Sequence, residues 1–165
     1  MTHSPLRQSL FGLACWLLAS FATGGVGAIA SVSAASFYGV LMQPAWAPPA
    51  WLFGPVWTTL YVLMGIAAWL VWREHGFGKA GIALRFYIAQ LLANALWSWL
   101  FFAWHLGAIS VVEIIVLWLL IGSTLLTFWK LHKVAALMLV PYLVWVSFAA
   151  ALNIALWRLN PVALS

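Results

Sequence analysis

The first half of the chain contains a long stretch without a single charge, and this feature most limits what the chain can fold into. No Asp, Glu, Lys, Arg or His occurs from Gln8 through Trp72. Soluble domains contain about 25% charged residues, whereas this chain of 165 residues is 67% hydrophobic and 5% charged. Such a chain has too little polar surface to face water on all sides. The sequence therefore predicts an integral membrane protein.

Five apolar segments are long enough to cross a bilayer as helices, because a hydrocarbon core of about 30 Å requires about 20 residues. Backbone groups in lipid must bond within their own segment, which favours helices over strands. We therefore expect a single all-α domain over residues 1–165, built as a multi-pass bundle of five transmembrane helices. The expected spans are residues 10–32, 51–72, 81–102, 108–129 and 134–157.

Basic residues are distributed unequally between the two ends of the expected bundle. The end opposite the N-terminus has only Arg158. The positive-inside rule therefore predicts a cytoplasmic N-terminus and favours a bacterial inner membrane. Basic residues near span ends orient helices, so the net charge of +5 does not indicate a nucleic-acid partner. The basic residues at the N-terminal end are Arg7, Arg73, Lys79, Arg85, Lys130 and Lys133.

The first expected connection, residues 33–50, is the longest and is rich in proline and tryptophan. The prolines of QPAWAPPA fix their own backbone and favour extended conformations in the residues before them. We therefore expect a stiff strap that forms a lid over the bundle, with Trp46 held between prolines. Pro55 and Pro141 fall inside expected spans and predict bends there, because each removes a helical hydrogen bond.

Aromatic and amide side chains recur at helical spacing on three expected spans. Residues three or four apart share one face of a helix, and amides inside a membrane need partners in the bundle interior. Periodicity alone leaves two interpretations equally open, ordinary helix packing and the lining of an internal pocket. The three faces are Phe53, Trp57 and Tyr61; Gln90, Asn94 and Trp97; and Trp145, Ala149, Leu152 and Asn153.

Three blocks of the sequence resemble the TspO/MBR family, the bacterial tryptophan-rich sensory proteins and the mitochondrial translocator protein. They are QPAWAPPAWLFGPVWTTLY, AQLLANALWSWLFF and PYLVWVSFAAALN, in family order between Phe37 and Arg158. The resemblance implies a five-helix bundle, usually a dimer, that binds tetrapyrroles such as protoporphyrin IX and haem-related compounds beneath the first loop. It implies a membrane receptor, sensor or transporter that requires no cofactor.

The resemblance also implies which residues contact the ligand. Trp57 and Trp145 are candidate catalytic residues in the alternative function, a light-dependent porphyrin-degrading enzyme. Indoles suit the faces of a flat apolar ring, and Arg158 and His105 suit its carboxylates. The family's sterol pattern needs a tyrosine where this chain has Ile154, which argues against sterol binding there. The ligand-binding positions are Trp46, Phe53, Gly54, Trp57, Asn94, Trp97, Trp145, Ala149 and Leu152.

Conventional catalysis has little support in the sequence. The chain has two carboxylates, Glu74 and Glu113, and no aspartate, so neither paired carboxylates nor a Ser-His-Asp set is available. Its four histidines have unrelated spacings and predict no metal site. We expect Glu113 to pair with Arg158, with ligand contact, dimer contact or proton handling as alternatives. A polar-solute carrier, the other rival function, would need a charged path at mid-membrane.

The first expected span contains the motif ATGGVGA, in which Gly24 and Ala28 have small-xxx-small spacing. Small residues allow two helices to approach closely. We expect them to form a homodimer interface, chiefly because the resembling family is dimeric. The rival interpretation is that these residues make room for a ligand inside the bundle.

Overall fold

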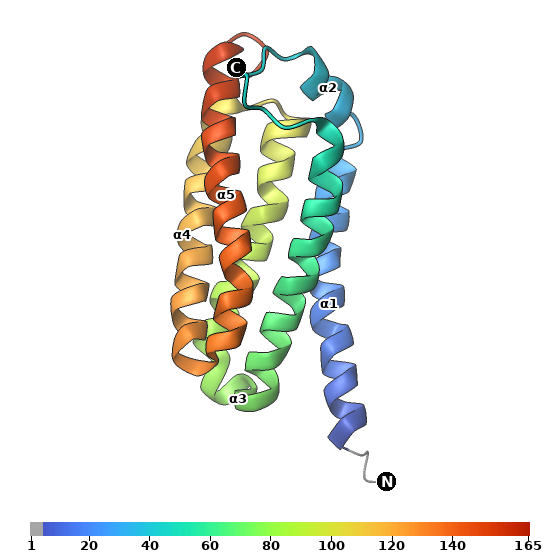
Figure 1. Ribbon diagram of the computed structural model, residues 1–165, viewed down its shortest axis with the longest axis vertical. Helices are drawn as coiled ribbons and strands as arrows, with labels where there is room; N and C mark the ends of the chain where they lie inside the picture. Colours follow the sequence, from blue (N-terminus) through green and yellow to red (C-terminus); the bar gives the residue numbers. More distant parts are fainter. Residues whose placement is uncertain (1–4) are drawn as a thin grey trace.

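The computed structural model describes residues 5–165, which fold as a bundle of long helices (Figure 1). Residues 5–165 form α-helices with one 3₁₀ turn and one π-helical turn and contain no strand, which confirms the all-α prediction. The elements in chain order are α1 (Pro5–Ala30), α2 (Ala34–Val40), η1 (Ala50–Leu52), α3 (Phe53–Ser98), η2 (Trp99–Ala103), α4 (Gly107–Leu131) and α5 (Lys133–Leu159).

Within residues 5–165, four helical stretches are long and apolar enough to cross a membrane, in agreement with a multi-pass membrane protein. The longest, Ala50–Ala103, has 54 residues. One crossing needs only about 20 residues. This stretch reverses at Gly76, where φ is 60° and ψ is −173°, so the arms formed by residues 53–75 and 77–98 run antiparallel (Figure 1). The second and third expected spans are therefore two arms of one element.

The reversal in α3 is tighter than the sequence suggested. We expected a loop at REHGFGKA, but this segment is helical except at Gly76. The backbone conformation of Gly76 lies in a region that is essentially restricted to glycine. One residue without a side chain therefore turns the chain through the full angle between two spans.

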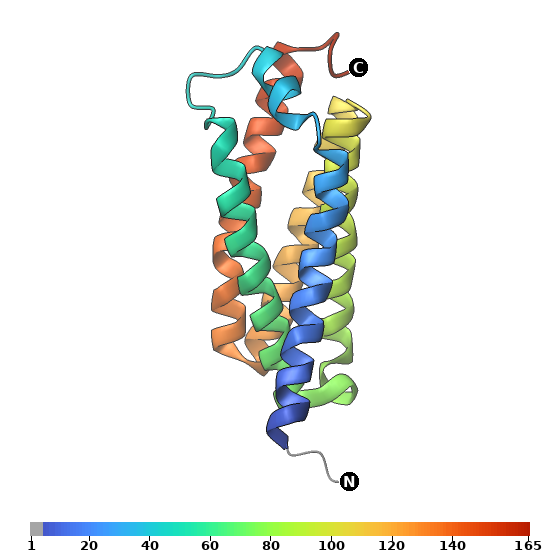
Figure 2. The same ribbon diagram turned by 90° about the vertical axis from the view of Figure 1, so that its right-hand side faces the viewer.

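Helix α1 packs against both arms of α3, and α4 packs against α3 and α5 (Figures 1 and 2). Glycine allows close approach, since a Cβ on Gly65 would lie 2.8 Å from the side chain of Leu17 in α1. Ser20 of α1 forms a buried 2.6 Å hydrogen bond with Tyr87 in the second arm. Small residues and a buried polar pair therefore fix α1 on α3, as expected for helices that associate in lipid.

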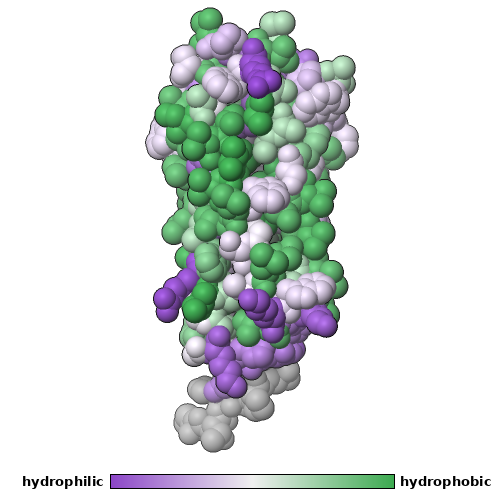
Figure 3. Space-filling model, turned by 90° about the vertical axis from the view of Figure 1, so that its left-hand side faces the viewer, coloured by the Kyte–Doolittle hydropathy of each residue, from purple (hydrophilic) through white to green (hydrophobic). Residues whose placement is uncertain are grey.

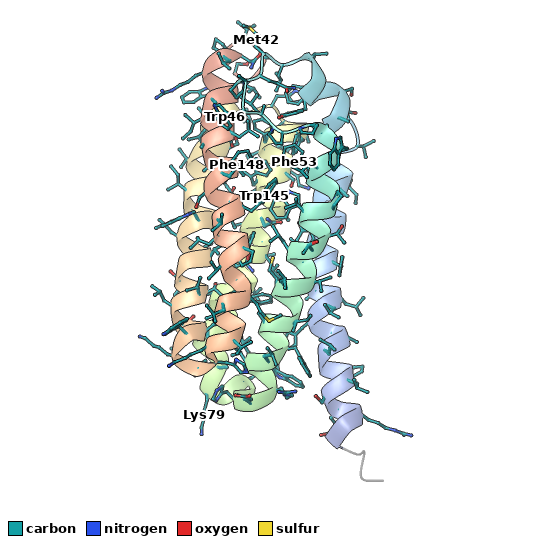
Figure 4. The ribbon with its side chains drawn as sticks, viewed as in Figure 1. Met42, Trp46, Phe53, Lys79, Trp145 and Phe148 are labelled. Atoms are coloured by element: carbon teal, nitrogen blue, oxygen red, sulfur yellow. The ribbon has the colours of Figure 1, made fainter. Side chains whose placement is uncertain are left out.

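The surface has the polarity of a membrane protein. On the face that Figure 3 shows, hydrophobic residues cover the middle of the bundle, and hydrophilic residues gather mainly near the lower end. Lys79 lies at this lower end (Figure 4), and α1 begins on the same side (Figure 1). The expected grouping of basic residues at one end is thus reproduced, although which compartment this end faces stays a prediction.

The first connection is only partly the extended strap that we expected. Its first part is the helix α2, and residues 41–49 then lead without helix to η1. Pro49 is extended, with ψ of 146°, and directly precedes the first helical residue, Ala50. Pro55 does not bend α3, because the 3₁₀ turn η1 places it in the first α-helical turn, where a missing N–H is tolerated. At the other expected bend, α5 continues as a helix through Pro141.

Candidate functional site

A cavity of about 330 Å³ lies between α1, both arms of α3 and α5, beneath α2, and it is partly open at exposed wall residues such as Ala28, Ala35 and Gly54. Its wall is mainly apolar and aromatic, and none of its residues is charged. Polar groups in the wall are limited to hydroxyls and indole N–H groups. The lining residues are Gly24, Gly27, Ala28, Ser31, Ala34, Ala35, Tyr38, Ala50, Phe53, Gly54, Trp57, Tyr61, Trp97, Ser98, Phe102, Trp145 and Ala149.

The structure brings most of the expected ligand-binding residues to this wall. Three do not line it: Trp46 lies above, on the connection, and Asn94 and Leu152 are buried in the helix core behind it. Those that line it are Phe53, Gly54, Trp57, Trp97, Trp145 and Ala149.

Asn94 connects three helical segments in the core. The hydroxyl of Tyr61 donates to Oδ1 of Asn94 at 2.8 Å, and Nδ2 of Asn94 donates to the hydroxyl of Tyr142 at 3.2 Å. All three residues are buried. Asn94 therefore acts on the cavity through Tyr61, whose ring it holds in the wall, and not by facing the cavity itself.

Trp97 is fixed by a second buried chain of hydrogen bonds. Its Nε1 donates to Oδ1 of Asn153 at 2.9 Å, and Nδ2 of Asn153 donates to Oγ of Ser110 at 3.1 Å. The ring of Trp97 also stacks on Phe101, with 5.5 Å between centroids. Phe101 belongs to the π-helical turn η2, a distortion frequent at functional sites. This wall of the cavity is therefore rigid.

The other two indoles in the wall pack against further aromatic rings. Trp57 stacks on Tyr61 at 5.5 Å and meets the edge of Tyr142 at 6.1 Å. Trp145 meets Phe53 at 5.9 Å and Phe148 at 5.5 Å. Its Nε1 is buried and has no hydrogen-bond partner among the described residues. No hydrogen bond to the described residues therefore fixes the ring of Trp145.

The connection above the cavity is held closed by hydrogen bonds that the sequence did not reveal. Asn160 makes two, since its Oδ1 accepts from the backbone N–H of Met42 at 2.8 Å and its Nδ2 donates to the Met42 carbonyl at 2.9 Å. Tyr38 donates to the Pro48 carbonyl at 3.0 Å, and Gln43 donates to the Tyr38 carbonyl at 2.6 Å. Burial raises the pKa of Tyr38, so this hydroxyl stays a neutral donor.

These lid residues carried only weak signals in the sequence. Tyr38 and Gln43 lie in the connection between two spans, where conformation is hard to infer from pattern. Asn160 follows the last expected span and is 118 residues away from its partner Met42. No local motif indicates a contact over such a separation.

The small residues of α1 are divided between the cavity wall and the outer face of the helix. A Cβ on Gly24 would lie 2.7 Å from the ring of Tyr61, and Gly24 and Ala28 both line the cavity. A Cβ on Gly25 would meet no atom within 4 Å. This placement favours the interpretation in which these residues make room beside a ligand. The homodimer itself stays a prediction.

The expected ion pair between Glu113 and Arg158 is wrong. Glu113 is 8% exposed, and both of its carboxylate oxygens lack a partner among residues 5–165, whereas Arg158 is exposed. Sequence position gave their depth in the membrane, but not the faces of α4 and α5 that they occupy. His105 stacks on Phe37, with 4.0 Å between ring centroids, and neither it nor Arg158 lines the cavity.

The second carboxylate, Glu74, lies at the lower end of the bundle. It is partly exposed and 3.3 Å from His132, with His75 and Arg73 at 4.0 Å. This group connects the reversal of α3 with the turn between α4 and α5. None of these four residues lines the cavity.

The fold and this site define a class of protein: a multi-pass helical membrane protein with an uncharged, aromatic cavity under a hydrogen-bonded connection. Residues 14–158 match the model of the TspO/MBR family. The chain belongs to this family.

Relatives from bacteria and animals support the assignment. The protein CrtK of Rhodobacter capsulatus is 40% identical over 158 residues, which cover 93% of this chain and 96% of CrtK. The tryptophan-rich protein TspO of Chlorobaculum tepidum is 37% identical over 161 residues, 94% of this chain and all of the relative. The human translocator protein is 36% identical over 126 residues, 75% of each chain.

Proposed function

We propose that this protein is a membrane receptor, sensor or transporter that binds tetrapyrroles such as protoporphyrin IX or haem-related compounds in the cavity beneath α2. The observation that carries the proposal is the convergence of three indoles, Trp57, Trp97 and Trp145, from three helical segments on one uncharged cavity. Aromatic rings stack well on a flat apolar ring. The names of the relatives, tryptophan-rich sensory protein and translocator protein, agree with sensing or transport.

The dimensions and charge of the cavity constrain how such a ligand is bound. Ligand pockets are typically about 300–1,000 Å³, so a cavity of about 330 Å³ is at the small end and must widen to receive a whole macrocycle. Because the wall has no charge, the ring belongs inside and the carboxylates belong at the rim. The hydroxyls of Ser31 and Ser98, which line the cavity, are candidate donors to polar atoms of the ring.

A titration of purified protein with protoporphyrin IX, followed by porphyrin absorbance, tests this proposal. Trp57→Ala removes one ring face from the wall, and we expect it to weaken binding by about tenfold, or about 1.4 kcal/mol. Trp129→Ala is the matched control, since Trp129 is 45% exposed on α4 and does not line the cavity. Equal affinities of wild type and Trp57→Ala would contradict the proposed site.

One observation favours a second candidate function, light-dependent degradation of porphyrin. Trp57, Tyr61 and Tyr142 form a continuous group of oxidisable rings, with centroids 5.5 and 6.1 Å from that of Trp57. A photoexcited porphyrin in the cavity could take an electron from Trp57 or Trp145. Illumination of the complex in the presence of oxygen distinguishes the two. New absorbing products that disappear in Trp145→Phe would support degradation, whereas an unchanged pigment would support binding alone.

The proposal includes the setting of the protein. We propose that the N-terminal end of the bundle faces the cytoplasm of a bacterium, that the cavity and its lid lie toward the opposite face of the inner membrane, and that the protein forms a homodimer. The concentration of basic residues at the lower end supports this orientation.

A further inference from the structure

The cavity has a second boundary besides the lid, and this boundary faces the lipid. An apolar groove runs along the outside of the bundle between the first arm of α3 and α5. Trp145 lines both this groove and the internal cavity. Trp145 therefore contributes to both the outer groove and the wall of the cavity. The groove residues are Pro55, Val56, Thr59, Leu60, Leu63, Pro141, Val144, Trp145 and Phe148.

A row of aromatic rings, here called the aromatic seam, closes the space between α3 and α5. It consists of Trp46, Phe148, Trp145 and Phe53, with successive centroids 5.8, 5.5 and 5.9 Å apart. Figure 4 shows these four side chains between α5 and the first arm of α3. The seam thus extends from the lid connection down to the wall of the cavity.

The aromatic seam is held by weaker constraints than the rest of the wall. Trp97 has a hydrogen bond to Asn153, whereas Nε1 of Trp145 has none within residues 5–165. Rotation of Trp145 therefore breaks ring contacts but no hydrogen bond. On the groove side, Pro141 lacks the N–H that would bond the carbonyl of Leu137, so α5 has one helical hydrogen bond fewer in the turn before this ring.

The lid side of the cavity is held by directional hydrogen bonds instead of ring contacts. The connection above it is tied down by the two hydrogen bonds between Asn160 and Met42 and by those of Tyr38 and Gln43. Opening this side breaks several directional bonds at once. Opening the seam exposes apolar rings to lipid, which is as apolar as the bundle interior and therefore imposes little penalty.

We propose that the aromatic seam is a lateral gate, and that apolar ligands reach the cavity from the bilayer by way of the groove when Trp145 and Phe148 swing aside. The inference rests on the proposed function, since it assigns a route to the same cavity. It also explains how a small cavity receives a large ring, because displacement of Trp145 joins the cavity to the groove. The ligand is thus one that partitions into the hydrocarbon layer before it binds.

The test compares the rates of protoporphyrin IX binding and release with its equilibrium affinity, on protein in lipid nanodiscs with the porphyrin dissolved in bilayer. Val144 is 63% exposed and lines the groove but not the cavity. We expect Val144→Trp to obstruct the groove, slowing both rates several-fold and leaving the affinity unchanged. Val112→Trp is the control, because Val112 is also 63% exposed but lies on α4. We expect Phe148→Ala, which removes part of the seam, to accelerate both rates.

The possible results distinguish failure of the proposed gate from failure of the proposed binding site. If Val144→Trp binds and releases porphyrin at the rates of Val112→Trp, the gate is refuted while the site stands. A larger change of rate in Asn160→Ala than in Val144→Trp would place the route under the lid and also refute the gate. Wild-type protein that shows no saturable binding would overturn the proposed function, and the gate with it.

Discussion

Trp97 and Trp145 line the same cavity but are held in different ways. Trp97 donates to Asn153 inside the bundle, while the N–H of Trp145 has no partner among the described residues. A hydrogen bond in the membrane interior contributes modestly, but an unpaired acceptor left in a buried site is costly. The first indole is therefore anchored by a hydrogen bond, and the second is held by packing against other rings.

This difference gives a prediction for stability. Trp97→Phe leaves Oδ1 of Asn153 without its donor, so we expect it to lower the free energy of unfolding by about 1–3 kcal/mol. Trp145→Phe removes the same indole nitrogen but breaks no hydrogen bond, and we expect a smaller loss. Thermal unfolding in detergent, followed by circular dichroism, compares the two. A greater loss in Trp145→Phe would show that the hydrogen-bond assignment is wrong.

Gly24 and Gly25 are adjacent in α1 but have opposite surroundings. A side chain on Gly24 would collide with Tyr61 in the cavity wall, whereas one on Gly25 would meet no atom within 4 Å. We expect Gly24→Val to reduce porphyrin affinity by about tenfold or more, and Gly25→Val to preserve it.

Sedimentation of the same two variants tests the dimer. Dissociation of a dimer by Gly25→Val would assign this outer face of α1 to the partner copy.

At the scale of elements, the spans could be predicted from the sequence because length and hydropathy determine which segments cross a bilayer. The helix α2 and the π-helical turn η2 could not, because both depend on packing against other segments. The Glu113–Arg158 pair failed for a related reason. Position along a span gives depth, but the side of the helix depends on how the bundle assembles.

In the candidate site, too, some residues could be predicted from the sequence and others could not. The periodicity of Phe53, Trp57 and Tyr61 indicated one face of one helix, and the structure places all three on the cavity. Asn94 was on the expected face but connects Tyr61 with Tyr142 instead of reaching the cavity. The sequence pattern could not distinguish a residue that lines the cavity from one that supports a lining residue, because both have side chains that point into the bundle.

The reversal of α3 depends on one backbone conformation. Gly76 has a φ of 60° and a ψ of −173°, and a residue with a Cβ pays about 1–3 kcal/mol for such a conformation. We expect Gly76→Ala to lower the thermal unfolding midpoint. Gly78→Ala is the control, because Gly78 is helical with open space around its Cβ, and alanine favours a helix by about 1 kcal/mol. Equal midpoints for the two variants would contradict the account of this turn.

At the scale of the whole molecule, the distribution of charge predicts the orientation in the membrane. In a Cys15→Ser background we expect Lys79→Cys to be protected from a membrane-impermeant maleimide in intact bacterial cells, because that end faces the cytoplasm. Val162→Cys, at a residue 90% exposed beyond α5, should be labelled from outside once the outer membrane is permeabilised. The opposite pattern would invert the topology and place the lid in the cytoplasm.

The central claim is that the uncharged cavity beneath α2 is where a tetrapyrrole binds, and filling that cavity tests it most directly. Ala149 lines the cavity, and Ala151 lies on the exposed side of the same helix, α5. In a protoporphyrin IX titration we expect Ala149→Phe to weaken binding by at least about tenfold and Ala151→Phe to bind like wild type. Identical affinity in all three proteins would show that the porphyrin binds elsewhere.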